Sequence, residues 1–202
     1  MTVFEGTRIA VLDTETTGLD PGQGHVLVEV ACVMLDGGEI GETWSTLVNP
    51  GQPIHPDASA VHGITDAMVR DAPAPAVVAA ELESRCAGRA LVFHNAAFDL
   101  PFLEVFMRRG GRGPLLHPVV DTLGLARGLL GPGGNSLGKL ATRFKLEPEA
   151  THRALGDALT AARLLRVLAA RWEGERGVCT VAELAAASQD ALRLTNWRSR
   201  AG

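Results

Sequence analysis

Tyrosine is absent from this sequence, and aromatic residues make up only 4% of its 202 residues. Cysteine is also scarce: Cys32, Cys86 and Cys179 are an odd number without metal-ligand spacing, so we expect free thiols in a reducing cytoplasm. No apolar run approaches the length that spans a bilayer, and the N-terminal residues MTVFEGTR lack the apolar core of a signal peptide. We therefore expect a cytoplasmic protein with no membrane partner.

Positive charge is limited as well. The formal net charge is −4, and Lys139 and Lys145 are the only lysines. An acidic chain with few aromatic residues is poorly suited to broad binding of a nucleic-acid backbone. The charge still allows an enzyme that meets phosphate through bound metal ions and a local groove, or one that a protein partner holds on its substrate.

The order of apolar segments predicts an α/β fold. Residues 8–12, 25–35 and 42–48 read as strands, and Asp36-Gly37-Gly38 is a turn typical of an antiparallel pair. The pattern then alternates between helices at 75–87, 98–109, 136–144 and 153–172 and strands at 90–94 and 119–121. One mixed sheet with helices on its faces follows from this order.

A change of composition near the C-terminus suggests a second unit. Residues 173–177 read EGERG, and Thr180 and Glu183 have the spacing of a capping box for one more helix. We expect a domain at 1–172 and a C-terminal helical extension at 173–202. Its arginines near the end, Arg193, Arg198 and Arg200 around Trp197, fit contact with nucleic acid, a partner or solvent, and a docked or frayed helix is the favoured interpretation.

The first predicted strand ends in two acidic residues. Asp13 and Glu15 lie two positions apart in VLDTETTGLD, and alternate side chains of an extended strand share a face. Two neighbouring carboxylates repel each other, which raises at least one pKa unless a cation lies between them. The pair is therefore either a solvated strand end or half of a metal site.

Two aspartates and a histidine extend this pattern to the predicted helices. Asp99 in HNAAFDLPFL falls in a first helical turn, where capping explains it as well as catalysis does. Asp157 lies on the apolar stripe of the 153–172 helix, and a buried unpaired carboxylate costs several kcal/mol, roughly, unless it is neutralised or bound to a cation. His152 precedes the same helix, so it can project toward the same site.

Four carboxylates and one histidine together indicate metal-dependent chemistry at phosphorus. Hard oxygen ligands suit Mg²⁺ or Mn²⁺ better than zinc. Paired divalent ions held by carboxylates serve in-line displacement at phosphorus. A histidine that titrates near neutrality can deprotonate the attacking water.

Three motifs, DTETTG, HNAAFD and HRALGD, occur in this order in the chain. The set resembles the DEDD exonuclease superfamily, in the branch whose third motif carries histidine, and it is similar to the proofreading epsilon subunit of bacterial DNA polymerase III. The segments AVHGIT (60–65), VVDTLGLAR (119–127) and NSLGKL (135–140) resemble that family in the same order. The resemblance covers roughly residues 8–170, and three motifs in order are far more specific than one.

The resemblance implies a ribonuclease-H-like fold, with a mixed five-stranded sheet flanked by α-helices. It implies two Mg²⁺ or Mn²⁺ ions on Asp13, Glu15, Asp99 and Asp157, with His152 as general base. It also implies release of nucleoside 5′-monophosphates from single-stranded or frayed DNA 3′ ends, by a stand-alone enzyme or one bound to a DNA polymerase subunit. The residues that it assigns to substrate binding are Thr16, Gly18, Leu19, Val61, His62, Asn95 and Phe98, although Asn95 and Asp121 fit structural roles equally well.

Three other interpretations stay open. The same core suits an exoribonuclease that trims short RNAs or RNA 3′ ends. A binding module on the same fold would act through protein contacts, although the intact acidic set argues against it. The carboxylates of an unrelated α/β protein would be caps and strand ends, which requires all three motifs to be coincidental.

Overall fold

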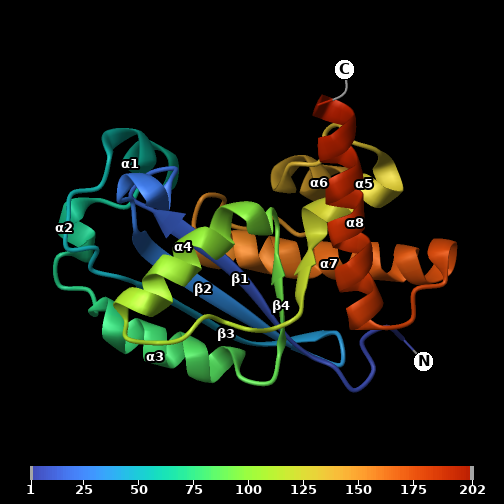
Figure 1. The fold of residues 1–202 in the computed structure, drawn as a ribbon, viewed down its shortest axis with the longest axis horizontal. Helices are drawn as coiled ribbons and strands as arrows, with labels where there is room; N and C mark the ends of the chain where they lie inside the picture. Colours follow the sequence, from blue (N-terminus) through green and yellow to red (C-terminus); the bar gives the residue numbers. More distant parts are fainter. Residues whose placement is uncertain (1, 201–202) are drawn as a thin grey trace.

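A mixed five-stranded sheet lies at the centre of the protein (Figure 1). The structure, a computed structural model, describes the backbone of residues 2–200 and the side chains of residues 2–193. The strand order is β3-β2-β1-β4-β5, with β1 antiparallel to β2 and parallel to β4. The strands are β1 (Arg8–Thr16), β2 (Leu27–Asp36), β3 (Glu39–Leu47), β4 (Ala90–Phe93) and β5 (Val119–Asp121). The predicted mixed sheet is confirmed.

The sequence predicts that the first strand ends at Leu12. In the structure the central strand β1 continues through Asp13 and Glu15 to Thr16. Strand β2 offers a long partner, so that Asp13 pairs with Ala31 and Glu15 with Glu29. The register shifts only after Glu15. The acidic pair therefore belongs to a regular strand, and its two side chains share one face of the sheet.

Side chains of β1 enter two separate apolar cores. Ile9 and Val11 pack in the core beneath α7 (Ala154–Arg176), whereas Ala10 and Leu12 pack in the core beneath α3 (Pro75–Cys86) and α4 (Ala96–Arg109). This alternation explains why the strand reads as a continuous apolar run, since both of its faces are covered. The carboxylates farther along β1 continue the α7 face.

Helices cover both faces of the sheet, with α3 and α4 on one side and α7 on the other (Figure 1). Helices α1, α2 and α5, of 7, 4 and 9 residues, were not predicted from the sequence. No helix in the described part of the chain is long and apolar enough to cross a membrane. The helices are α1 (Pro56–His62), α2 (Asp66–Val69), α3 (Pro75–Cys86), α4 (Ala96–Arg109), α5 (Thr122–Leu130), α6 (Leu137–Arg143), α7 (Ala154–Arg176) and α8 (Val181–Arg200), with a short 3₁₀-helix at Pro21–Gln23.

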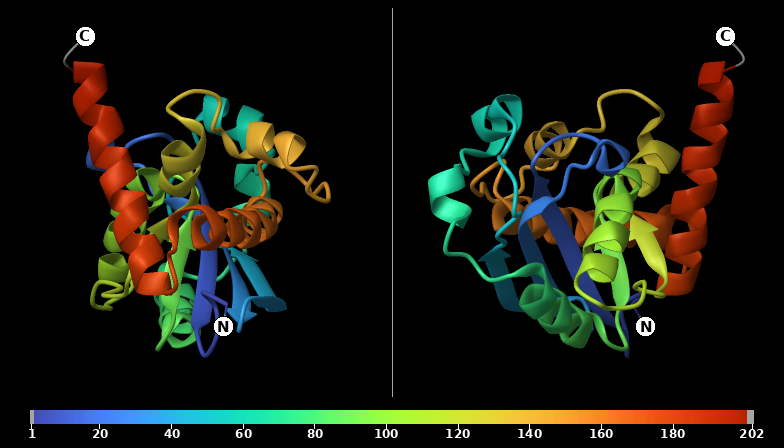
Figure 2. Two further views of the ribbon diagram at one scale, coloured as in Figure 1. Left: turned by 90° about the vertical axis from the view of Figure 1, so that its right-hand side faces the viewer. Right: turned by 60° about the vertical axis from the view of Figure 1, so that its left-hand side comes forward.

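The last helix, α8, runs beside β5 and α5 at one edge of the sheet (Figure 2). Ser188 is fully buried there, and its Oγ accepts the backbone N–H of Asp121 at 3.2 Å. Helix α7 continues to Arg176, past the predicted end at residue 172, because the chain leaves it only at Gly177, with a φ of 70°. The division into 1–172 and 173–202 stays a prediction, and the side chains of Trp197, Arg198 and Arg200 lie outside the described residues.

Candidate active site

The carboxylates of Asp13, Glu15 and Asp157 meet at one end of the sheet. Each offers a ligand atom, and these atoms all lie within 4.8 Å of one another. Asp13 and Glu15 come from β1, and Asp157 comes from the first turn of α7, which packs on the same face of the sheet. The structure thus places three of the four predicted metal ligands side by side.

The fourth predicted ligand, Asp99, lies in the first turn of α4 and is only 4% exposed. Thr14 donates its hydroxyl to Asp99 Oδ1 at 2.8 Å, so a β1 side chain on the α4 face holds this carboxylate. Asp121, at the end of β5, accepts the backbone N–H groups of Asn95 and Ala96 at 3.0 and 2.9 Å. These bonds fix the start of α4 and therefore the position of Asp99.

All four carboxyl groups hold their protons more tightly than ordinary acids. Burial, followed by repulsion from neighbouring acids, raises the pKa of Asp13 well above its usual range. Burial and then repulsion from Asp157 raise the pKa of Glu15 to about 8. Burial raises the pKa of Asp99 to about 7, although the hydrogen bond from Thr14 opposes this shift, and burial also raises the pKa of Asp157. A divalent cation would remove the repulsion, and these oxygen donors fit Mg²⁺ or Mn²⁺.

A fifth acid, Glu29 on β2, lies opposite Glu15 and is only 3% exposed. Its charge is balanced, because Arg153 donates to both of its carboxylate oxygens, from Nη2 at 2.7 Å and from Nε at 3.1 Å. The backbone N–H of Ala154 adds a third hydrogen bond at 3.0 Å. Glu29 is not among the site residues predicted from the sequence. It could have been identified as an acidic residue inside the apolar run HVLVEVACVML.

The predicted general base, His152, lies in the exposed turn that leads into α7. Its φ of 56° is left-handed, and its backbone N–H donates to Asp157 Oδ2 at 3.0 Å. Its imidazole makes no hydrogen bond to the described part of the chain and is open to solvent. The backbone thus joins His152 to one carboxylate of the cluster, while its ring stays available to a substrate or water.

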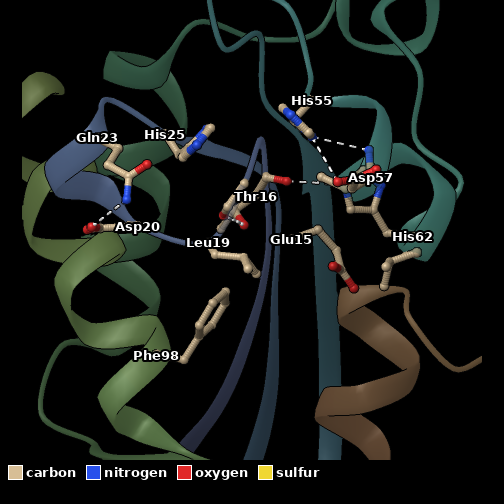
Figure 3. Close-up of a pocket in the computed structure, with 13 residues that line it drawn as sticks. Glu15, Thr16, Leu19, Asp20, Gln23, His25, His55, Asp57, His62 and Phe98 are labelled. Atoms are coloured by element: carbon tan, nitrogen blue, oxygen red, sulfur yellow. Dashed lines mark hydrogen bonds and ion pairs between the residues drawn. The ribbon is translucent and has the colours of Figure 1, made fainter.

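Glu15 also lines a cavity of about 430 Å³ beside the carboxylates (Figure 3). Six of the predicted substrate-binding residues line it as well: Thr16, Gly18, Leu19, Val61, His62 and Phe98. The Nδ1 atom of His62 accepts a hydrogen bond from the backbone N–H of Ile64 at 3.0 Å. The ring proton is therefore on Nε2, which donates to the Thr16 carbonyl at 3.1 Å. Leu19 and Val61 are 84% and 58% exposed, which leaves two apolar side chains free to contact a ligand.

The seventh predicted substrate-binding residue, Asn95, does not line this cavity. It precedes α4 with a φ of 77°, and its backbone N–H donates a hydrogen bond to Asp121 Oδ1. Its role in substrate binding stays a prediction.

Six residues that the sequence analysis did not select complete the cavity: Asp20, Gln23, His25, His55, Asp57 and Ala58. His25 packs flat on Gly18, where an added Cβ would lie only 2.5 Å from the ring Nδ1. The rings of His25 and His55 meet edge to face, with centroids 6.4 Å apart. Figure 3 shows His25 toward the side of the cavity that carries Gln23, and His55 toward the side that carries Asp57 and His62. The sequence around residues 20–25 and 55–58 has no local pattern that identifies these six residues as part of a cavity.

Comparison with known proteins relates this chain to nucleases. A model of the exonuclease family matches residues 10–165. A DNA polymerase III subunit epsilon from Treponema pallidum is 34% identical over 180 residues, which cover 88% of this chain and 83% of that protein. A DNA polymerase III subunit epsilon-like protein from Rhodobacter capsulatus is 43% identical over 175 residues, or 84% of this chain. The chain spans only 25% of the length of that second protein.

Solved structures share the same architecture. Exonuclease X, in complex with 5′-overhanging duplex DNA, superposes with a TM-score of 0.69 at 30% sequence identity, covering 89% of this chain and 99% of that one. Exonuclease I superposes with a TM-score of 0.71, covering 84% of this chain and 44% of that one. At 20% identity, the second likeness concerns the fold alone.

Proposed function

The chain belongs to the exonuclease family, and we propose that it is a metal-dependent 3′–5′ exonuclease that releases nucleoside 5′-monophosphates from single-stranded or frayed DNA 3′ ends. One observation carries this proposal: Glu15 belongs both to the carboxylate cluster and to the wall of the adjacent cavity. A phosphate held at the cluster would therefore leave its nucleoside within reach of the cavity.

The cluster of Asp13, Glu15 and Asp157, with Asp99 beside it, would hold two Mg²⁺ or Mn²⁺ ions. When bound, such ions activate water and stabilise the charge that develops on both sides of the scissile phosphate. The protein supplies the anionic oxygens and keeps them in place, because Thr14 fixes Asp99 and the backbone N–H of His152 fixes Asp157.

His152 would act as the general base. Its imidazole is exposed and has no protein partner among the described residues, so it is available to accept a proton from the attacking water. Imidazole groups commonly accept the proton of an attacking water in hydrolysis.

The cavity would receive the departing nucleotide. Leu19, Val61 and Phe98 would offer apolar surface to the sugar and the base. The polar side chains of Gln23 and His55, which also line the cavity, would contact the edge of the base. A nucleotide can enter such a cavity only when its base is unpaired, and a mismatched end frays at lower cost. This explains the preference for single-stranded or frayed ends.

DNA is the favoured substrate, because exonuclease X is seen in complex with DNA and the relatives are named as subunits of a DNA polymerase. Association with a polymerase subunit in the cytoplasm, in a proofreading role, is part of the same proposal. An exoribonuclease acting on RNA 3′ ends is the alternative, and a non-catalytic binding module is less favoured because the carboxylate set is complete.

The test is hydrolysis of matched, labelled DNA and RNA oligonucleotides with Mg²⁺ or Mn²⁺, and identification of the products as nucleoside monophosphates. Asp13→Ala serves as the inactive control. Much faster hydrolysis of RNA would replace DNA as the substrate. Equal release by the wild type and by Asp13→Ala would contradict an enzymatic function.

A further inference from the structure

The buried ion pair between Glu29 and Arg153 joins two parts of the chain that are far apart in sequence. Glu29 lies on β2, and the three donors to its carboxylate come from Arg153 and Ala154, at the very start of α7. The Glu29 side chain is only 4% exposed, whereas that of Arg153 is 42% exposed. The pair therefore attaches the first turn of α7 to the sheet.

The segment held in this way carries two of the proposed catalytic groups, one before α7 and one in its first turn. His152 directly precedes Arg153, and Asp157 is in the first helical turn. The His152 imidazole makes no hydrogen bond within the described part of the chain, so the backbone of this turn is what brings the ring near the carboxylates. A shift of the backbone at residue 153 would move the ring by a similar amount.

A close approach on the other side of this turn limits its movement. At Gly156, an added Cβ would overlap the carbonyl oxygen of Ala150, so the loop before α7 lies directly against the helix. The loop before α7 thus packs against the helix at Gly156, and the residues that follow the loop are bonded to Glu29.

We propose that Glu29 and Arg153 are positioning residues, which hold His152 and Asp157 in register with the β1 carboxylates. Neither residue needs to touch the substrate for this role. In their absence the turn would sample other positions, while the sheet and the nucleotide cavity would stay as they are.

A purely stabilising role explains this pair less well. Taking the Glu29 carboxylate out of water is costly, and well-packed apolar residues often replace a buried ion pair without loss of stability. Glu29 also adds repulsion to a site where it already raises the pKa of Asp13 and Glu15. A geometric requirement gives a reason to keep a negative charge at this place.

The first test uses the metal-free protein and needs no activity. Amide hydrogen exchange is compared between the wild type and Glu29→Gln, which replaces one of the two acceptor oxygens by an NH2 group that can only donate. We expect exchange in residues 150–156 to become roughly tenfold faster or more, with that of helix α3 unchanged. Unchanged exchange at 150–156, or an equal increase throughout the protein, would overturn the proposal.

The second test rests on the proposed exonuclease function. We expect Glu29→Gln and Arg153→Gln each to lower kcat by roughly 10- to 100-fold, with KM within about threefold, because misplacement by about 1 Å is costly in rate. The double variant should be no slower than either single variant, since both remove the same attachment. An unchanged kcat, or a loss confined to KM, would contradict a positioning role.

Two further variants keep this test informative. Arg153→Lys retains the charge and should fold even if Glu29→Gln does not, and its kcat should lie between that of the wild type and Arg153→Gln. Glu42→Gln breaks a 2.7 Å ion pair with Arg85, far along the chain from α7, and should leave kcat unchanged. If the wild type itself hydrolyses no substrate, the proposed function fails, and hydrogen exchange alone decides the role of the pair.

Discussion

Replacing Glu15 by glutamine should stabilise the metal-free protein while it abolishes activity. Burial and the nearby carboxylates raise the pKa of Glu15 from 4.5 to about 8. The ionised side chain is therefore less favourable in the folded protein than in the unfolded chain. Glutamine has nearly the same shape and carries no charge, so the substitution removes this penalty without opening a cavity.

The penalty depends on pH in a defined direction. Because the pKa is raised on folding, the penalty is absent below the unfolded value near 4.5 and grows as pH rises toward the folded value near 8. Linkage gives less than about 1 kcal/mol at pH 5, about 3 kcal/mol at pH 7 and about 4 kcal/mol at pH 8. We expect about half of these values to be measured, since water and neighbouring groups relax around a charge.

The assay is thermal unfolding in the presence of a chelator, followed by circular dichroism at pH 5 and pH 8. At pH 8 the Glu15→Gln variant should unfold roughly 5 °C above the wild type, and at pH 5 the two should nearly coincide. Addition of Mn²⁺ should then stabilise the wild type more than the variant, because metal binding uses the carboxylate.

Glu104→Gln, an exposed glutamate on α4, is the matched control and should shift neither transition. The reasoning would be refuted if Glu15→Gln were less stable than the wild type at pH 8 without metal. A stabilisation of equal size at both pH values would also refute it, because it could not come from the titration of Glu15.

Three further outcomes test the other parts of the site. His152→Ala should lower kcat by about 10²- to 10⁴-fold with less than about 0.5 kcal/mol change in unfolding free energy, and near-normal hydrolysis would remove it from its role. Gly156→Ala should destabilise the fold by about 1–3 kcal/mol in urea unfolding, because its Cβ meets the Ala150 carbonyl, whereas Gly138→Ala, with open space around it, should stabilise slightly. Asparagine at position 55 can still cap α1. His55→Asn should slow removal of a normal 3′ nucleotide by about 3- to 10-fold and leave removal of a 3′-abasic residue unaffected. An equal effect on both substrates would show that His55 does not contact the base.

The same-face placement of the carboxylates could be predicted from local pattern alone. Asp13 and Glu15 are two positions apart in a strand, so they share one face of it, and Asp157 continues the apolar stripe of α7, so it points toward the surface on which that helix packs. Strand and helix periods are properties of a few consecutive residues, which is why they can be read directly from a sequence. The motif order then selected Asp99, which helix capping explains equally well, and His152, which lies before its helix.

What the sequence by itself determined is therefore the fold class, the acidic set and the family resemblance. Only the tertiary structure paired Glu29 with Arg153, 124 residues away. It also brought the rings of His25 and His55 together in the wall of the cavity and left Asn95 out of that wall. These contacts depend on how separate elements pack against one another. Local periodicity fixes the direction of a side chain relative to its own strand or helix, but its neighbours are decided only when that element docks on the rest of the protein.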